Sequence, residues 1–554
     1  MVRISHLLTT SPSRYLPIRY LVAPLIAAHL TAQPGAAQQE RYTSSYLPLG
    51  HWGYEVVDLL AARGRLEGLP QLNRPYRRVD LARSLLAAEE RGSLLPEERR
   101  WVELLMQELG YEARLVQEGA DQDLRFGGEF EAGLKGVSHE HRDLLRPKGD
   151  RALWPVLELR LLGDAPNVAG AFRMRWDGIY LNDPQFPGGR AIPARECDPL
   201  VARCAYRVEE GYVEAQLPYV RLFFGRLYRN WGMAGTEGFL ISDYAYSYDH
   251  VGYWFGSSRL ALSGLFTLLN DFPGDTARYF SAHRLDWQVR DNLALGFSEA
   301  VVYAGVGRKL DLNLTNPVGI YEISPSADAE TNTMGALEVW WRPKPRLVTY
   351  GALLIDNTRV GEPNEAEGLT QWGLHLAAQL PQVTPRLAAR ADFSVVNSLA
   401  YRSRVDRSFF YTFQGLSLGR DKSDAVIGSI QLTWLKGSDR PDGSDRSGGS
   451  QRLGGVSWLR PGLLALEPRL QVMWRGEDDV RKPWPDDAFT GHDLLLVGRV
   501  ETTVRPSLAG RWVSPHGELK WDLGVNWIKN LGNQPNGWQA KFVGRVQLSV
   551  RARL

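Results

Sequence analysis

The chain has 554 residues, a formal net charge of only +2 and 44% hydrophobic residues. Because the charge is nearly balanced, it gives no reason to expect that nucleic acid or an acidic polymer binds the protein surface as a whole. Met is scarce at 6 residues, whereas 18 Trp and 22 Tyr are present, and these two ring types favour membrane–water interfaces.

The N-terminus has the layout of a secretory signal peptide over residues 1–37. Arg3, Arg14 and Arg19 precede an apolar stretch at 21–32, and small residues follow where cleavage is expected. The rest of the chain contains no apolar run long enough for a transmembrane helix. We therefore expect an exported protein that is secreted, periplasmic or an outer-membrane barrel.

Residues 42–111 predict a small α-helical periplasmic module, because apolar residues recur at helical spacing in three short segments that each end at a glycine. Part of this module resembles an S-layer-homology motif in the strings His51-Trp52-Gly53-Tyr54, Leu59 to Gly64, and Pro75-Tyr76-Arg77-Arg78 with Leu81-Ala82. The resemblance implies contact with peptidoglycan or its attached polymers. The alternative is a helical plug or collar that only packs on a barrel.

The two cysteines, Cys197 and Cys204, lie in a polar stretch between Pro187 and Arg207. Two nearby cysteines in an oxidising compartment most simply form one local disulfide. A metal site would need further ligands, and no His lies near these cysteines. We expect a disulfide and no metal.

Residues 124–554 predict an all-β fold, a transmembrane antiparallel β-barrel. Short segments alternate apolar and polar residues, as where Phe126, Phe130 and Leu134 alternate with Glu129 and Lys135. A period of two marks a strand with one apolar and one polar face, and we expect the apolar face to contact lipid. Because each spanning strand needs about 9–11 residues, the length suits roughly 16–18 strands, an even number.

The connections alternate between tight turns and long polar segments. Tight turns are expected at 290–292, 343–345 and 381–385, and long loops at 307–333, 356–368, 397–406, 436–455 and 476–492. Outer-membrane barrels place short turns in the periplasm and long loops outside the cell. All five long segments are therefore predicted to be extracellular.

The last predicted strand, 540–554, runs into the C-terminus. Its apolar face includes Val546 and Leu548, and its polar face includes Arg545 and Gln547. A terminal strand without a partner would leave an open edge, and closing the sheet into a barrel removes that edge. The pattern predicts localisation in the outer membrane.

The densest polar and aromatic region, 219–259, contains the candidate polysaccharide-binding residues. These are Arg226, Trp231, Asp243, Tyr246 and Tyr248. Flat aromatic rings suit the C–H faces of sugars, and Arg holds an acidic sugar carboxylate with two hydrogen bonds. Alternatively, the aromatic residues belong to an interfacial girdle and the charged residues form ion pairs in the lumen.

Candidates for catalysis are weak. On a strand, Arg284 and Asp286 share a face and His283 points away from both, which predicts an inward salt bridge between Arg284 and Asp286. The string 248–250 with the serines at 257–258 supplies pieces of a hydrolase, but no nucleophile-elbow motif surrounds them. We expect neither an enzyme nor a cofactor.

Several short motifs resemble capsule-assembly outer-membrane barrels of the Wzi type. They are Phe224-Gly225-Arg226, Asn230-Trp231-Gly232, Gly238 to Asp243, His283 to Asp286, Asn292 to Gly296, Asn316-Pro317, Asn332-Thr333 and Leu353 to Asp356. The resemblance implies a non-catalytic barrel that retains capsular or related exopolysaccharide at the cell surface. A porin or substrate-specific channel is the alternative, and an outer-membrane hydrolase is a second one.

Overall fold

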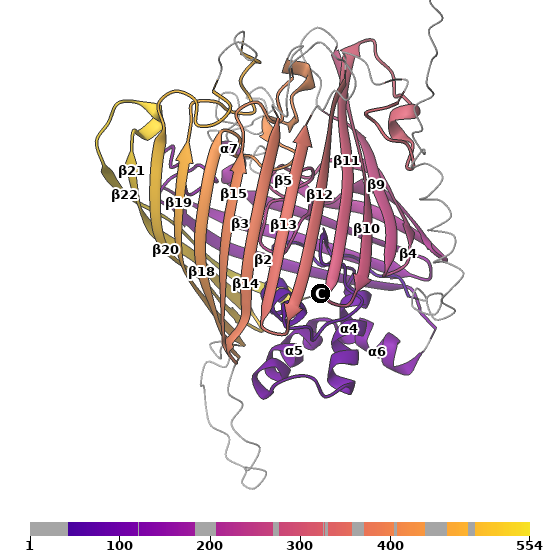
Figure 1. The fold of residues 1–554 in the computed structure, drawn as a ribbon. Coiled ribbons are helices and arrows are strands. Elements are labelled where there is room, and N and C mark those ends of the chain that lie inside the picture. Colours follow the sequence, from indigo (N-terminus) through magenta and orange to yellow (C-terminus); the bar gives the residue numbers. More distant parts are fainter. Residues whose placement is uncertain are drawn as a thin grey trace, which may run out of the picture.

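The structure is a computed structural model of the chain, and it describes residues 42–119, 121–182, 206–269, 276–324, 326, 331–356, 371–403, 407–437, 462–485 and 493–553. In these residues, eighteen antiparallel strands form one closed barrel with helices packed at one end (Figure 1). The predicted fold class is therefore confirmed, with the strand count at the upper end of the expected range.

The barrel strands follow one another around the wall in chain order. They are β2 (Arg125–Val137), β3 (Ala152–Ala165), β4 (Val168–Asp177), β5 (Tyr206–Leu217), β6 (Val220–Arg226), β8 (Asp249–Gly256), β9 (Leu260–Leu268), β10 (Thr276–Arg290), β11 (Leu293–Val306), β12 (Thr331–Lys344), β13 (Leu347–Asp356), β14 (Trp372–Thr384), β15 (Leu387–Val396), β18 (Ala425–Gly437), β19 (Leu463–Arg475), β20 (Glu501–Ser514), β21 (Gly517–Lys529) and β22 (Gln539–Arg553). The final strand pairs with the first, with Arg553 opposite Glu129, so the terminal edge is closed as predicted.

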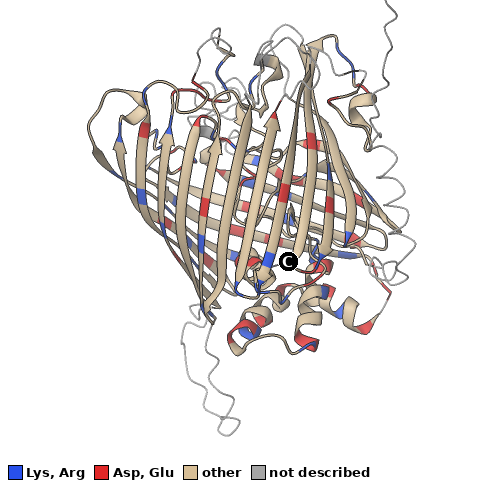
Figure 2. Cartoon of the chain, in the orientation of Figure 1, with Lys and Arg blue, Asp and Glu red and all other residues tan. Residues whose placement is uncertain are grey.

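The apolar face of the strands points outward. On β22, Phe542, Leu548 and Val550 are 59%, 51% and 60% exposed, whereas the neighbouring Ser549 is buried on the lumen side. Charged residues recur along the strands (Figure 2), and many pair inside the barrel, as Arg505 does with Asp522. A continuous outer apolar surface around a closed barrel is the lipid-facing band of an outer-membrane protein. The predicted faces and location are confirmed.

The two ends of the barrel differ in their connections. The tight turns that follow β10, β12 and β14 lie at the same end as the helices, because Arg63 donates hydrogen bonds to Pro381 O and Pro385 O. Because outer-membrane barrels have their short turns in the periplasm, this is the periplasmic end. The end of β18 and the start of β19 also belong to it, since Gly437 and Gly462 lie against Trp101 and Leu104. The prediction of an extracellular loop at 436–455 is therefore wrong for its start at the end of β18, and 438–455 lie outside the described residues.

The helical module fills the periplasmic mouth of the barrel. It contains α3 (Gly53–Ala62), α4 (Arg78–Glu90), α5 (Pro96–Glu108) and α6 (Gly110–Glu118). Its apolar core, including Trp101 and Leu105, continues into Leu435, Leu463 and Val513 of the barrel wall. In the described residues, every helix is too short or too polar to cross a membrane. The module is thus packed as a plug, and its contact with peptidoglycan stays a prediction.

Two extracellular connections fold back into the lumen. We call them the first insert, 227–248, which contains β7 (Asn230–Trp231), and the second insert, the described residues of 397–424, which contains β16 (Thr412–Phe413) and β17 (Leu416–Ser417). The inserts bind each other through backbone groups, with Ser242 N donating to Leu418 O at 2.9 Å. Together they occupy the half of the lumen that lies against β10–β14.

Candidate functional site

The first insert owes its shape to one asparagine and one glycine. The Asn230 side chain donates to Thr236 O at 2.7 Å and accepts from Gly238 N at 2.9 Å, which closes a tight loop. A Cβ on Gly238 would collide with the backbone oxygens of Trp231 and Ile241. The motif residues in this stretch therefore fix a compact backbone turn.

This insert meets the periplasmic module inside the barrel. In the module, β1 (Asn73–Arg74) pairs antiparallel with β7, with Asn73 opposite Trp231 and Arg74 opposite Asn230. Gly232 N extends the contact by donating to Leu72 O at 2.9 Å. An extracellular connection and the periplasmic module thus share one short sheet in the lumen.

Three of the five predicted binding residues are buried. Trp231 and Tyr246 are 3% exposed and Tyr248 is 7% exposed. The Tyr248 ring packs edge-on against Phe280 and Phe413. The interpretation of Trp231 as an open stacking face is wrong, because the β1–β7 sheet carries this ring into the barrel core.

Arg226 lies apart from the other candidates. It ends β6 at the extracellular rim, and its Nε is 2.9 Å from Oδ1 of Asp249 on the neighbouring strand. This carboxylate is not that of Asp243, the acidic residue among the candidates. The strand pairing places Asp249 opposite Arg226 instead.

Asp243 and Tyr246 line a cavity of 540 Å³ in the extracellular half of the lumen, and Asp243 is exposed to it. We call it the upper cavity. The Tyr246 ring lies between two guanidinium groups, with Arg142 4.4 Å and Arg207 4.2 Å from its centroid. Such stacking orients both cations.

The upper cavity has charges of both signs around its tyrosines. Lys422 bridges Asp143 and Glu237 at 3.3 and 3.4 Å, and Asp177 accepts from Lys135 at 3.0 Å. These groups come from β2, β4, both inserts and the 138–151 connection. Because these residues are far apart in the sequence, no local sequence pattern groups them. The set offers hydrogen-bond donors and acceptors, which are the groups that bind sugar hydroxyls and carboxylates.

A lower cavity of 630 Å³ continues from the upper one, since Asp243, Glu237 and Arg469 line both. Its floor is formed by the plug, through Tyr54, Glu55 and Asp58 of α3 and Arg74. Arg74 is held 2.7 Å from Asp58. The cavities follow the side of the lumen that the inserts leave unfilled.

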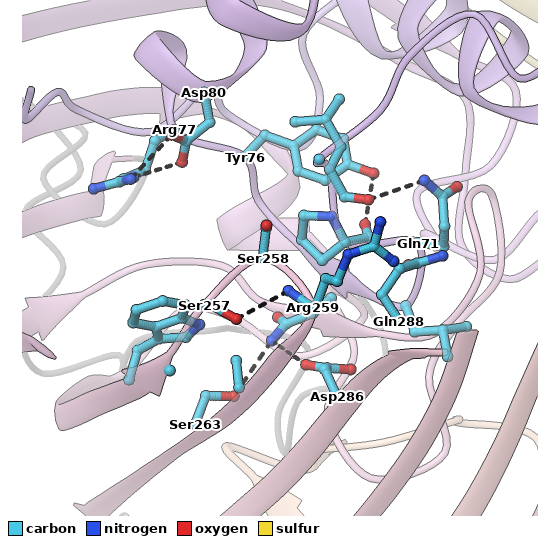
Figure 3. A pocket seen from close by; sticks show the side chains of 18 of the residues that line it. Gln71, Tyr76, Arg77, Asp80, Ser257, Ser258, Arg259, Ser263, Asp286 and Gln288 are labelled. Carbon is cyan, nitrogen blue, oxygen red and sulfur yellow. Dashed lines mark hydrogen bonds and ion pairs between the residues drawn. The ribbon is translucent and has the colours of Figure 1, made fainter. Parts of the chain in front are cut away.

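A third cavity of 510 Å³ lies at the periplasmic end between the module and the β8–β9 turn (Figure 3). Tyr76, Arg77 and Asp80 line one side, and Ser258 and Arg259 line the other. Although burial raises the pKa of Asp80, the guanidinium groups of Arg77 and Arg83 outweigh it and hold the pKa at about 2. Asp80 is therefore ionised at neutral pH.

Of the remaining candidates from the sequence, one pair lies in the lumen and the others lie outside the described residues. Arg284 is fully buried in the lumen, with Nε 2.6 Å from Asp286 Oδ1 and a further bond to Glu338. Asp286 also accepts from Asn73 of the module at 3.1 Å. The predicted signal peptide and the pair Cys197 and Cys204 lie outside the described residues.

No protein-family model matches the chain, and no curated protein matches it in sequence. Its fold matches the solved structure of Wzi of Escherichia coli, with a TM-score of 0.57, 12% identity and coverage of 92% of this chain and 99% of that one. That structure is described as an outer-membrane, carbohydrate-binding β-barrel involved in group 1 capsule assembly. The predicted likeness to a Wzi-type barrel is thus confirmed at the level of the fold, and the S-layer likeness has no support.

Two outer-membrane proteins match less well. OccAB4 of Acinetobacter baumannii has a TM-score of 0.42 at 8% identity, covering 78% of this chain and 99% of that one. OccK11 of Pseudomonas aeruginosa has a TM-score of 0.38 at 10% identity, covering 79% and 99%. At these scores, the likeness carries no argument about function.

Proposed function

We propose that this outer-membrane barrel anchors capsular or related exopolysaccharide at the cell surface, without catalysis, by binding it in the upper cavity. The observation that carries the proposal is the cavity itself. It combines the exposed Asp243, Lys422 with its two carboxylate partners, and the Tyr246 ring stacked on the Arg142 guanidinium group, all in the extracellular half of the lumen. Its fold match to a barrel described as carbohydrate-binding supports the same ligand class.

The closed lumen favours anchoring over transport. A channel needs a continuous path, whereas here α3 forms the floor of the lower cavity and the β1–β7 sheet joins the first insert to the plug. Weak binding at each site is sufficient for retention, because one polymer engages many barrels at once.

The test replaces two residues of the upper cavity, Arg142→Gln and Asp243→Asn, in one chain. A matched control, Gln379→Ala with Ser429→Ala, changes only the lower cavity. We expect the first variant to assemble normally and to release polysaccharide into the medium, while the control retains it. Measurement of cell-bound and released polymer, with ion conductance of the purified barrels, separates the alternatives. Unchanged retention with altered conductance would support a channel and overturn anchoring.

A further inference from the structure

Two ionisable side chains face outward from the barrel wall. Glu299 of β11 and His283 of β10 are direct cross-strand partners, and His283 Nε2 is 3.4 Å from Glu299 Oε2. Side chains alternate along a strand, and Phe297, two residues before Glu299, is 42% exposed on the outer face. Glu299 therefore points to the side that contacts lipid, where an uncovered carboxylate is costly.

The extracellular segment 307–324 covers this pair from outside the barrel. It leaves β11 and returns along the outer side of the wall (Figure 1). The backbone N–H groups of Tyr321 and Glu322 donate to the two carboxylate oxygens of Glu299 at 2.9 and 3.0 Å. The Tyr321 ring lies 4.5 Å from the His283 ring. The carboxylate is thus fully paired with groups that the segment supplies.

The inner side of the segment is packed as tightly as a protein core. Tyr303 and Leu314 are fully buried between the segment and the wall, and Tyr321 is 1% exposed. Tyr279 stacks on Tyr303 with the ring centroids 5.0 Å apart and donates to Arg308 O at 3.0 Å. This contact fixes the segment to the outer surface.

The exposed side of the segment carries three large apolar side chains beside the polar Lys309, Asn313 and Asn316. Leu312, Val318 and Ile323 are 77%, 65% and 59% exposed. Phe297 of β11 and Leu337 of β12, the strands on either side of this connection, are also exposed apolar side chains, at 42% and 43%. Exposed apolar side chains that extend an existing hydrophobic surface indicate a further apolar contact, and lipid already covers the adjoining wall.

We propose that segment 307–324 is embedded in the outer leaflet of the membrane, where its outer side chains contact lipid acyl chains while its inner side shields Glu299 and His283. The segment replaces a stretch of ordinary apolar wall. It is a lipid-contacting element that is separate from the polysaccharide site.

The test uses spin labels in the full chain, with Cys197 and Cys204 replaced by serine, reconstituted in phospholipid vesicles. Labels are placed at Leu312→Cys and Val318→Cys. A label at Phe297→Cys gives the lipid reference, and one at the exposed Gln534→Cys in the β21–β22 connection gives the aqueous reference. The accessibility of each label to oxygen, which concentrates in lipid, is compared with its accessibility to a water-soluble nickel complex.

We expect the labels at 312 and 318 to resemble that at 297, with oxygen accessibility above nickel accessibility. A nickel-accessible pattern like that at 534 would place the segment in water and overturn the proposal. Protection from both reagents would indicate a protein partner on this face and would overturn it as well. Normal heat-modifiable migration of each labelled chain confirms that the barrel is closed.

Discussion

Asn73 and Trp231 are cross-strand partners in the lumen, although Asn73 enters from the periplasmic module and Trp231 from an extracellular connection. The two-residue ladder is short, but Asn73 is also held by Asp286 and Ser263 of the barrel wall. The first insert and the plug are therefore linked to each other and to the wall at one point.

Gly238→Ala should disturb this link. The added Cβ meets the backbone oxygens of Trp231 and Ile241, neither of which can rotate away. We expect higher ion conductance in planar bilayers and faster proteolysis of the first insert. Gly428→Ala is the matched control, since a Cβ there meets nothing within 4 Å. Equal conductance of the two variants would show that the link does not restrict the lumen.

A charge on the lipid face of the closing strand should impair assembly. Val546 is 38% exposed on the outer face near the middle of β22, whereas Gln547 points inward to Glu131 and Arg175. Val546→Arg should cost about 2–4 kcal/mol at the bilayer midplane, and Gln547→Arg much less. The yield of heat-modifiable barrel measures the difference. Similar yields would contradict the assigned faces.

The outer-wall segment predicts a rescue. Deletion of residues 309–323 leaves Glu299 and His283 against lipid, so the yield of assembled barrel should fall. Glu299→Leu with His283→Leu in the shortened chain should restore much of that yield, because the buried charge is removed with its shield. Failure of this rescue would show that the segment acts on assembly by some route other than shielding.

The ionisation of Asp80 should make the stability of the plug depend on pH. Its pKa of about 2 in the folded protein lies below the value of about 3.9 for an unfolded chain, so the ionised form stabilises the folded state. This stabilisation is present above about pH 4 and is lost as the pH falls through 2. Asp80→Asn should make the module more sensitive to pepsin at pH 5, and the difference from the unchanged chain should vanish near pH 2. A constant difference across this range would rule out titration of Asp80 as the cause.

The strands and their faces could be predicted because a period of two reports directly which side of a strand is apolar. The interior could not be predicted in this way. Trp231 and Tyr248 lie in a polar and aromatic stretch that is typical of a surface binding site. They are buried only because both inserts fold back into the lumen. The start of the 436–455 segment was assigned to the wrong side because it was judged by its length and polar composition, whereas the packing of Gly437 on Trp101 decides its side. The sequence around Arg142 and Lys422 does not mark either one as a site residue, because only the closed barrel brings them together.

The shared core of plug and wall sets an order of assembly. Trp101 and Leu105 lie early in the chain, yet they are buried against Leu435, Leu463 and Val513, which come from its last quarter. These side chains can therefore be covered only after β18–β20 have joined the wall beside the module. Full docking of the plug thus depends on strands from the far end of the chain.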